Sequence, residues 1–325
     1  MSIIISYKLP VRIDVKKQKF KKFESMIPKL SPWLHTFNFD DEVFVGHING
    51  IYGKSFITKK SPKNEIKKFK ELFFKINHDA HNNFFRNIFK DFVNECSVAL
   101  DVSSATGKFS FILAEQGFKK IFSSEIRKNQ CEQQRLIIDC AYNPKFKNVF
   151  VNNDLISADS KEYIKLYKNK NVDLVLSAGL LYHLSNPIQH LINCREIAKK
   201  YVIVHTKTHF LYNGCSEWSY KFEDKEWISL AWEGISAVPH YYWLQKFYKK
   251  IGFKSCKVVY PKIYSKIFPD FDKFDKKVSY KIRMSNLLSK FNINIGMNKL
   301  MNLRKKNPYK NYNLHPLFLT YILEV

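Results

Sequence analysis

The feature that most constrains the fold of this 325-residue chain is the segment 98–117, which changes character twice within a few residues. Residues 98–102 (VALDV) form an apolar run of strand length, with Asp101 near its end. Residues 103–107 (SSATG) are small, and apolar residues then recur at helical spacing up to Gly117, which suits a left-handed helix end. The segment therefore predicts a strand, a tight loop and a helix. A ligand can approach the backbone of such a loop, and an anion can bind the free N–H groups at the helix start.

A second apolar run, residues 121–125 (IFSSE), follows this helix and ends in Glu125. A carboxylate about 20 residues beyond the loop, at the tip of the second strand, is placed to accept hydrogen bonds from ribose hydroxyls. The pattern thus indicates a nucleoside-containing ligand at the carboxyl ends of the first two strands.

Short apolar runs continue to alternate with helical patterns along the chain. The predicted strands are 96–102, 120–124, 148–152, 172–177, 201–205, 253–259 and 317–325, and the predicted helices between them include 130–140, 187–199 and 241–251. Such alternation is typical of a parallel sheet covered by helices on both faces.

Two stretches resemble motifs of the class I S-adenosylmethionine-dependent methyltransferases. Residues 101–111 (DVSSATGKFSF) resemble the first motif, often DVGAATGFFSF, and residues 172–187 (VDLVLSAGLLYHLSNP) resemble the fourth-strand motif, often DLVLxxGVLYHLxxP. Ser103 replaces the usual first glycine, so its φ is either negative or strained. The resemblance covers about residues 96–260. It implies an α/β fold with a Rossmann-like seven-stranded methyltransferase sheet, the last strand antiparallel, flanked by helices.

The same resemblance implies S-adenosylmethionine as the cofactor. Asp101 would orient the loop and the methionine ammonium, Glu125 would bind the ribose, and Asp154 would accept from the adenine amino group. The full set of cofactor-binding candidates is Asp101, Ser103, Ala105, Gly107, Glu125, Ile126, Asp154, Leu155 and Ser177. Solvated loop and turn residues are the alternative interpretation of the acids among them.

The catalytic candidates are His183 and Tyr182, in the segment that lines the site between cofactor and acceptor in this family. Methyl transfer is an in-line displacement, so the protein mainly aligns the reactants. A hydroxyl or ring-nitrogen acceptor must also lose a proton, and a histidine titrates near neutral pH. We therefore expect His183 to act as the base. The alternative is a structural histidine.

Aromatic residues gather before the sixth strand, where a lid over the substrate or plain packing would each explain them. The substrate-binding candidates are Trp232, Glu233, Ser236, His209 and His240. The histidines of this region are irregularly spaced and lack an accompanying carboxylate motif, so no metal is expected. The six cysteines are scattered and form no Cys-x-x-Cys pair.

Two flanking segments lie outside the main pattern. Residues 1–95 precede the methyltransferase-like domain 96–325 as an N-terminal extension of helices and a small hairpin with an Asp-Asp turn. Its sequence at 33–36 (WLHT) looks like the N-terminal piece of methyltransferases similar to the tRNA wobble-uridine carboxymethyl-transferring enzymes and their uncharacterised relatives. A strongly basic insertion, 260–314, precedes the last strand.

The net charge of +25, from 54 basic and 29 acidic residues, leaves the acceptor open. A basic protein attracts RNA, but a lysine-rich composition also has causes unrelated to a substrate. A small-molecule hydroxyl or similar nucleophile is the favoured acceptor, tRNA or other RNA is the alternative, and a catalytically silent binding module is the alternative of another class. Apolar runs of bilayer length and a signal-peptide core are lacking, so a cytoplasmic protein without membrane contact is expected. The sequence says nothing about its oligomeric state.

Overall fold

The computed structural model describes residues 11–35, 37–40, 43–46, 56–58, 61–64, 66–67, 78–208, 218–222, 235–259 and 317–325. The predictions for His209, Trp232 and Glu233, and those for the basic insertion 260–314, lie outside the described residues.

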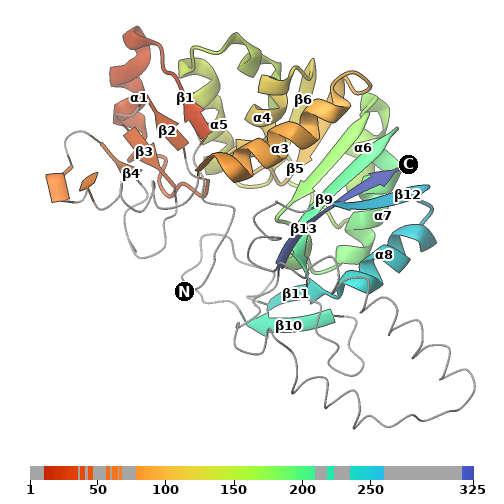
Figure 1. Cartoon of the computed structure of the whole chain (residues 1–325). Helices are drawn as coiled ribbons and strands as arrows, with labels where there is room; N and C mark the ends of the chain where they lie inside the picture. Colours follow the sequence, from red (N-terminus) through yellow and green to blue (C-terminus); the bar gives the residue numbers. More distant parts are fainter. Residues whose placement is uncertain are drawn as a thin grey trace, which may run out of the picture.

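A seven-stranded sheet forms the centre of the described structure (Figure 1). Its strands, in spatial order, are β12 (Ser255–Val259), β13 (Leu317–Glu324), β9 (Tyr201–Thr208), β8 (Leu174–Ala178), β5 (Val98–Val102), β6 (Lys120–Glu125) and β7 (Val149–Asn153). The strands from β9 to β7 are parallel, and β13 pairs antiparallel with both β9 and β12. The predicted Rossmann-like sheet with its antiparallel last strand is confirmed.

Helices cover both faces of this sheet. The helices α3 (His78–Phe92), α4 (Lys108–Gln116) and α5 (Lys128–Cys140) lie on one face, and α6 (Tyr163–Tyr167), α7 (Pro187–Ile197) and α8 (Tyr241–Lys250) lie on the other. Successive strand residues point to opposite faces, so Leu174 and Leu176 join the first apolar core while Val175 joins the second. Short 3-10 helices η2 (Pro144–Asn148), η3 (Lys168–Lys170) and η4 (Leu181–His183) connect these elements.

The N-terminal part of the described chain forms a second sheet beside α5 (Figure 1). It contains β1 (Val11–Ile13), η1 (Lys17–Lys19), α1 (Phe20–Met26), β2 (Phe37–Phe39), β3 (Val43–Val45) and β4 (Phe56–Ile57). β2 and β3 pair antiparallel, which confirms the predicted hairpin. The Gln133 side chain of α5 donates a 2.8 Å hydrogen bond to the carbonyl of Pro32, and Phe37 packs against Phe111 of α4. The N-terminal sheet and the first face of the large sheet therefore share one core.

The sequence patterns did not predict the antiparallel pair β10 (Trp218–Phe222) and β11 (Ile235–Pro239). β11 lies against η4, at the carboxyl end of β8. Among the described helices, none combines the length and the apolar character that crossing a bilayer requires.

Candidate functional site

The loop between β5 and α4 contains three residues with left-handed backbone conformation. Ser103 and Ala105 both have φ of 52°, and Gly107 has φ of 81°. For Ser103 this is the strained alternative, because a Cβ atom disfavours this region. Gln134 of α5 holds the strained loop through a 2.6 Å hydrogen bond to the Ala105 carbonyl. A Cβ atom on Gly107 would meet the Gln134 side chain at 2.9 Å, so this position requires glycine.

Asp101 lies buried beneath the loop and is bonded to the start of α4. One of its oxygens accepts the Ser110 hydroxyl at 2.6 Å, and the backbone N–H of Ser110 also donates to the carboxylate. The Ser110 hydroxyl is also hydrogen-bonded to the Ser123 hydroxyl at 2.9 Å, and the Ser123 hydroxyl donates to the side-chain oxygen of Gln134 at 2.6 Å. Burial raises the pKa of Asp101 to about 7, against the lowering effect of Ser110. Asp101 thus anchors the loop to the helix that follows it.

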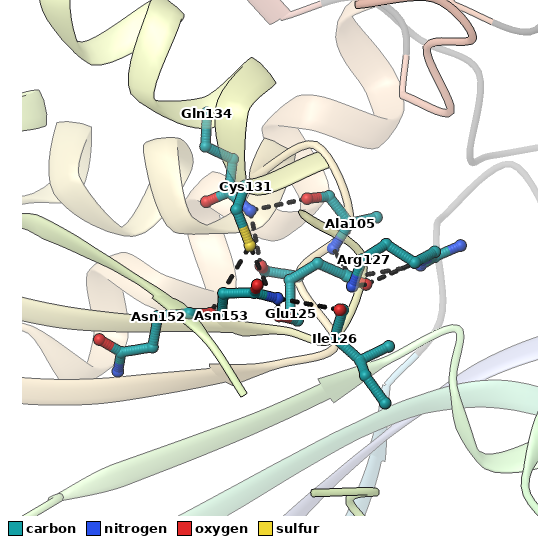
Figure 2. A network of polar contacts seen from close by, with 9 residues as sticks. Ala105, Glu125, Ile126, Arg127, Cys131, Gln134, Asn152 and Asn153 are labelled. Carbon is teal, nitrogen blue, oxygen red and sulfur yellow. Dashed lines mark hydrogen bonds and ion pairs between the residues drawn. The ribbon is translucent and has the colours of Figure 1, made fainter. Parts of the chain in front are cut away.

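Glu125, at the end of β6, has both carboxylate oxygens fully engaged (Figure 2). One oxygen accepts the Ala105 N–H at 2.8 Å and an Arg127 guanidinium N–H at 3.2 Å. The other accepts the Arg127 backbone N–H at 3.0 Å and its Nε at 2.8 Å. A carboxylate has about four acceptor positions, so Arg127 occupies those that a ribose would use. The sequence patterns did not predict the ion pair between Arg127 and Glu125. The signal that could have indicated it is a basic residue two positions after the acid at the end of a strand.

Asp154 follows β7, and the hydrogen bonds of its side chain within the described part of the chain all go to one carboxylate oxygen. Its Oδ2 accepts the Ser124 hydroxyl at 2.6 Å and the Tyr167 hydroxyl. Within the described part of the chain, Oδ1 has no hydrogen-bond partner and stays available to a donor such as an adenine amino group. The neighbouring apolar side chains Ile126 and Leu155 are 48% and 80% exposed. An open acceptor beside exposed apolar groups suits a flat, partly polar ring.

Ser177, at the end of β8, is bonded inside the fold. Its hydroxyl lies 2.8 Å from Nε2 of His190 on α7, and both residues are completely buried. Burial lowers the pKa of His190 to about 4. The predicted contact between Ser177 and the cofactor stays a prediction, because this hydroxyl faces α7.

The predicted catalytic pair lies on η4, directly after β8. The rings of Tyr182 and His183 are 4.1 Å apart, and the ammonium of Lys207, from β9, lies 4.1 Å from the Tyr182 ring. Ser236 and His240 are buried in and just after β11, which lies against η4. The structure therefore brings four predicted residues to one region and adds Lys207, which the sequence prediction passed over in favour of the histidines around it.

His205 is one of the irregularly spaced histidines near the carboxyl ends of the strands, and its ring is bonded inside the fold. His205 is buried in β9, where its Nδ1 lies 2.9 Å from the Thr320 hydroxyl, and burial lowers its pKa to about 3. In the described ranges, histidines, cysteines and carboxylates form no group of three or more that could hold a metal ion.

Comparison with known proteins finds structures with a similar fold but assigns the chain to no family. No protein-family model matches the sequence, and no curated protein matches it. The N-terminal domain of EvdMO1 with SAH bound is similar in structure, with 15% sequence identity, a TM-score of 0.53, and coverage of 74% of this chain and 90% of that one. The same domain in the presence of SAH and D-fucose shares 14% identity, with a TM-score of 0.53 and coverage of 76% and 91%. These similarities, together with the strand order, show the fold of the class I methyltransferases.

Proposed function

We propose that the protein is an S-adenosylmethionine-dependent methyltransferase acting on a hydroxyl or similar nucleophile of a small molecule. The observation that carries the proposal is the position of two carboxylates, Glu125 and Asp154, at the carboxyl ends of the neighbouring strands β6 and β7. These two acids stand beside the exposed apolar residues Ile126 and Leu155 and the loop 103–107. Adenosine presents ribose hydroxyls and an amino group on a flat ring, and this edge offers acceptors and apolar surface for both.

S-adenosylmethionine would supply an electrophilic methyl group on a sulfonium. Asp154 would accept from the adenine amino group, and Ile126 and Leu155 would pack on the ring. Glu125 would receive the ribose hydroxyls after its Arg127 guanidinium moves aside, because its acceptor positions are otherwise filled. Asp101 acts on the cofactor through the loop that it anchors.

The acceptor would meet the cofactor at η4. His183 would take the proton of the nucleophile as the methyl group is transferred, which contributes typically 10²–10⁴-fold to a rate. Tyr182 would line the acceptor-binding site, and the ammonium of Lys207, which lies against the Tyr182 ring, would place a positive charge in that site. Ser236 and His240, with Trp232, Glu233 and His209 outside the described residues, remain proposed substrate contacts.

A small-molecule acceptor is the preferred form of the proposal. The crystal of the EvdMO1 N-terminal domain prepared with D-fucose motivates sugars as the first acceptors to test. The net charge of +25 motivates the second candidate, methyl or carboxymethyl transfer to tRNA or another RNA.

Calorimetry with S-adenosylhomocysteine (SAH), followed by methyl transfer from labelled S-adenosylmethionine, tests the proposal. Heat of binding at micromolar ligand and label in a sugar panel are the expected results. An absence of heat at high micromolar ligand would leave the silent binding module as the better explanation.

Binding to bulk tRNA across a salt series separates the two acceptors. A steep fall of affinity with salt would indicate several phosphate contacts and favour RNA, and deleting residues 262–310 would then flatten the slope. Millimolar affinity even at low salt would leave the small molecule.

A further inference from the structure

Exposed lysines gather at one corner of the large sheet, where the strands β6 and β7 begin. β7 is an edge strand of this sheet, and the Asn148 side chain ties its start to that of β6 through a 3.3 Å hydrogen bond to the carbonyl of Phe118. The exposed lysines of this corner, which come from the start of β6, from η2 and from η3, are Lys119, Lys120, Lys145, Lys147, Lys168 and Lys170. These residues form the basic corner.

An exposed aromatic ring belongs to the same corner. Phe150 of β7 is 46% exposed, and the ammonium of Lys120 lies 5.3 Å from its ring centroid. Phe150 packs on Phe122 of β6 with centroids 6.3 Å apart, and Phe122 packs on Tyr167, which directly precedes η3. Because η2 leads directly into β7, these ring contacts connect all three segments that carry the lysines.

Carboxylates leave most of the positive charge of the basic corner unbalanced. Lys145 donates to the backbone carbonyl of Glu115 at 3.1 Å, while the Glu115 carboxylate is paired with Arg86. Lys168 lies 3.8 Å from a carboxylate oxygen of Glu196. Within the described residues, the lysines of this corner that form no ion pair are Lys119, Lys120, Lys147 and Lys170.

A structural role explains part of this pattern. The helices α4 and α5 end just before the starts of β6 and β7, and a cation stabilises the carbonyl end of a helix. Lys145 does so at the end of α4, through its bond to the Glu115 carbonyl. That role explains neither the second lysine in each segment nor the exposed ring beside them.

We propose that the basic corner and Phe150 bind single-stranded RNA, with phosphates at the lysines and a base stacked on the ring. Several lysines along one edge match the repeating charge of a nucleic-acid backbone, and bases stack on aromatic side chains irrespective of sequence. RNA commonly presents such unpaired bases in its loops and ends. An anionic membrane fits less well, because one ring on a sheet edge offers little apolar surface to insert.

The basic corner is separate from the proposed cofactor and acceptor sites. It lies at the amino ends of β6 and β7, whereas Glu125 and Asp154 lie at the carboxyl ends. The length of β6 places these two edges of the sheet roughly 16 Å apart. RNA bound at the basic corner is therefore a partner in addition to the acceptor, and its binding should not depend on the cofactor. The inference does not rest on the proposed methyl transfer.

Fluorescence anisotropy of a labelled single-stranded RNA of about 12 nucleotides, across a salt series, measures this binding. Lys119→Gln, Lys120→Gln and Lys147→Gln, combined in one variant, should reduce the slope of log affinity against log salt by about 2, because each phosphate contact contributes about 0.7 in a single strand. The matched control combines substitutions to glutamine at exposed lysines of the N-terminal part, namely Lys17, Lys21 and Lys29. It removes the same charge and should leave the slope unchanged.

Phe150→Leu tests the stacked base, because leucine keeps an apolar side chain on β7 and removes the aromatic ring. It should weaken binding of the single strand roughly 5- to 150-fold, as for the loss of one stacked base, without changing the salt slope. Duplex RNA of the same length should bind more weakly and should not respond to this substitution. Saturation with SAH should leave every one of these affinities unchanged.

An equal fall of the salt slope in both lysine variants would overturn the proposal, because binding would then follow net charge. Full RNA affinity of Phe150→Leu, or tighter binding of single-stranded DNA of the same sequence, would also contradict it. Vesicles of phosphatidylserine and phosphatidylcholine test the membrane. If the first lysine variant lost affinity for them and kept its affinity for RNA, the corner would be a lipid-binding surface. Thermal melts check that each variant folds, and unchanged SAH affinity in the lysine variants shows that the outcome concerns this corner alone.

Discussion

The proposed cofactor end and the proposed acceptor end of the site differ in the charge of their side chains. The cofactor end contains three carboxylates, Asp101, Glu125 and Asp154, each bonded to groups of its own chain. The acceptor end places Tyr182 and His183 beside the ammonium of Lys207. An acidic end suits a cationic, hydroxyl-rich ligand, and a basic, aromatic end suits a proton-accepting step.

The two ends also differ in how firmly their side chains are fixed. The three carboxylates lie in or directly after neighbouring strands of one sheet. Asp101 is bonded to α4, Glu125 to the loop and to Arg127, and Asp154 to Ser124 and Tyr167, so their positions are fixed before any ligand binds. The acceptor end depends on η4 and on β11, from a separate two-stranded sheet. Substitutions at the first end should therefore change binding and stability, and substitutions at the second should change turnover.

The largest expected effect is at the acceptor end. His183→Ala should lower turnover by roughly 10²–10⁴-fold, because the base that accepts the proton is lost. SAH affinity should be unchanged, as measured by calorimetry on the same preparation. An unchanged rate with intact cofactor binding would give His183 a structural role and remove the distinction between the two ends.

The next effect concerns stability at the cofactor end. Because burial raises the folded-state pKa of Asp101 from 3.8 to about 7, its ionisation opposes folding. This cost is absent below about pH 4, grows until about pH 7 and is then constant. The free energy of unfolding of Asp101→Asn, relative to wild type, should therefore rise across that window by an amount on the order of 4 kcal/mol.

Urea denaturation of both proteins at several pH values between 4 and 8 measures this difference. Comparison with wild type isolates Asp101 from the buried histidines, whose lowered pKa values act in the opposite sense. A difference that does not vary with pH would show that Asp101 is not buried as an ionisable group.

Glu125→Ala should weaken SAH by ~1–3 kcal/mol, the cost of ribose hydroxyls left without an acceptor. Turnover at saturating cofactor should change much less, which would separate this end from His183. Glu162→Ala, at an exposed position in an ion pair with Lys165, is the matched control and should have no effect on binding. Full SAH affinity in Glu125→Ala would place the ribose elsewhere.

The smallest effect is expected from Arg127→Met. Since the guanidinium must leave Glu125 before a ribose binds, its removal should leave SAH affinity within a few-fold of wild type, in either direction. Calorimetry again provides the measurement, with a thermal melt to check folding. A loss of affinity greater than about tenfold, equivalent to about 1.4 kcal/mol, would mean that Arg127 itself contacts the ligand.

The large sheet followed closely from the sequence because its strands are short apolar runs with clear ends. The predicted strand 120–124 corresponds to β6, and the helix 241–251 to α8. The pair β10 and β11 escaped prediction because Trp218 and Tyr220 suit a packed aromatic cluster as well as a strand. In the structure Trp243 stacks on Phe247 of the same helix with centroids 4.8 Å apart and meets Trp218 of β10 edge-on at 5.1 Å, so aromatic packing joins α8 to β10.

The candidate site could be predicted from the sequence only where a resemblance to a family motif indicated its residues. Asp101, Glu125 and His183 occupy strand or loop ends, as the motifs imply. Arg127 was missed because its ion pair with Glu125 decides its importance, and such pairing is not visible in a linear pattern.

The position of β13 between β9 and β12 has a consequence for the order of folding. β9 pairs with a strand that lies roughly a hundred residues later in the sequence, since Thr208 opposes Leu317. Such distant pairing slows folding, because the chain must close a long loop before the contact is made. Until β13 arrives, β9 is an unprotected sheet edge that other chains can join. The newly made protein should therefore be most prone to aggregation during the synthesis of residues 209–316.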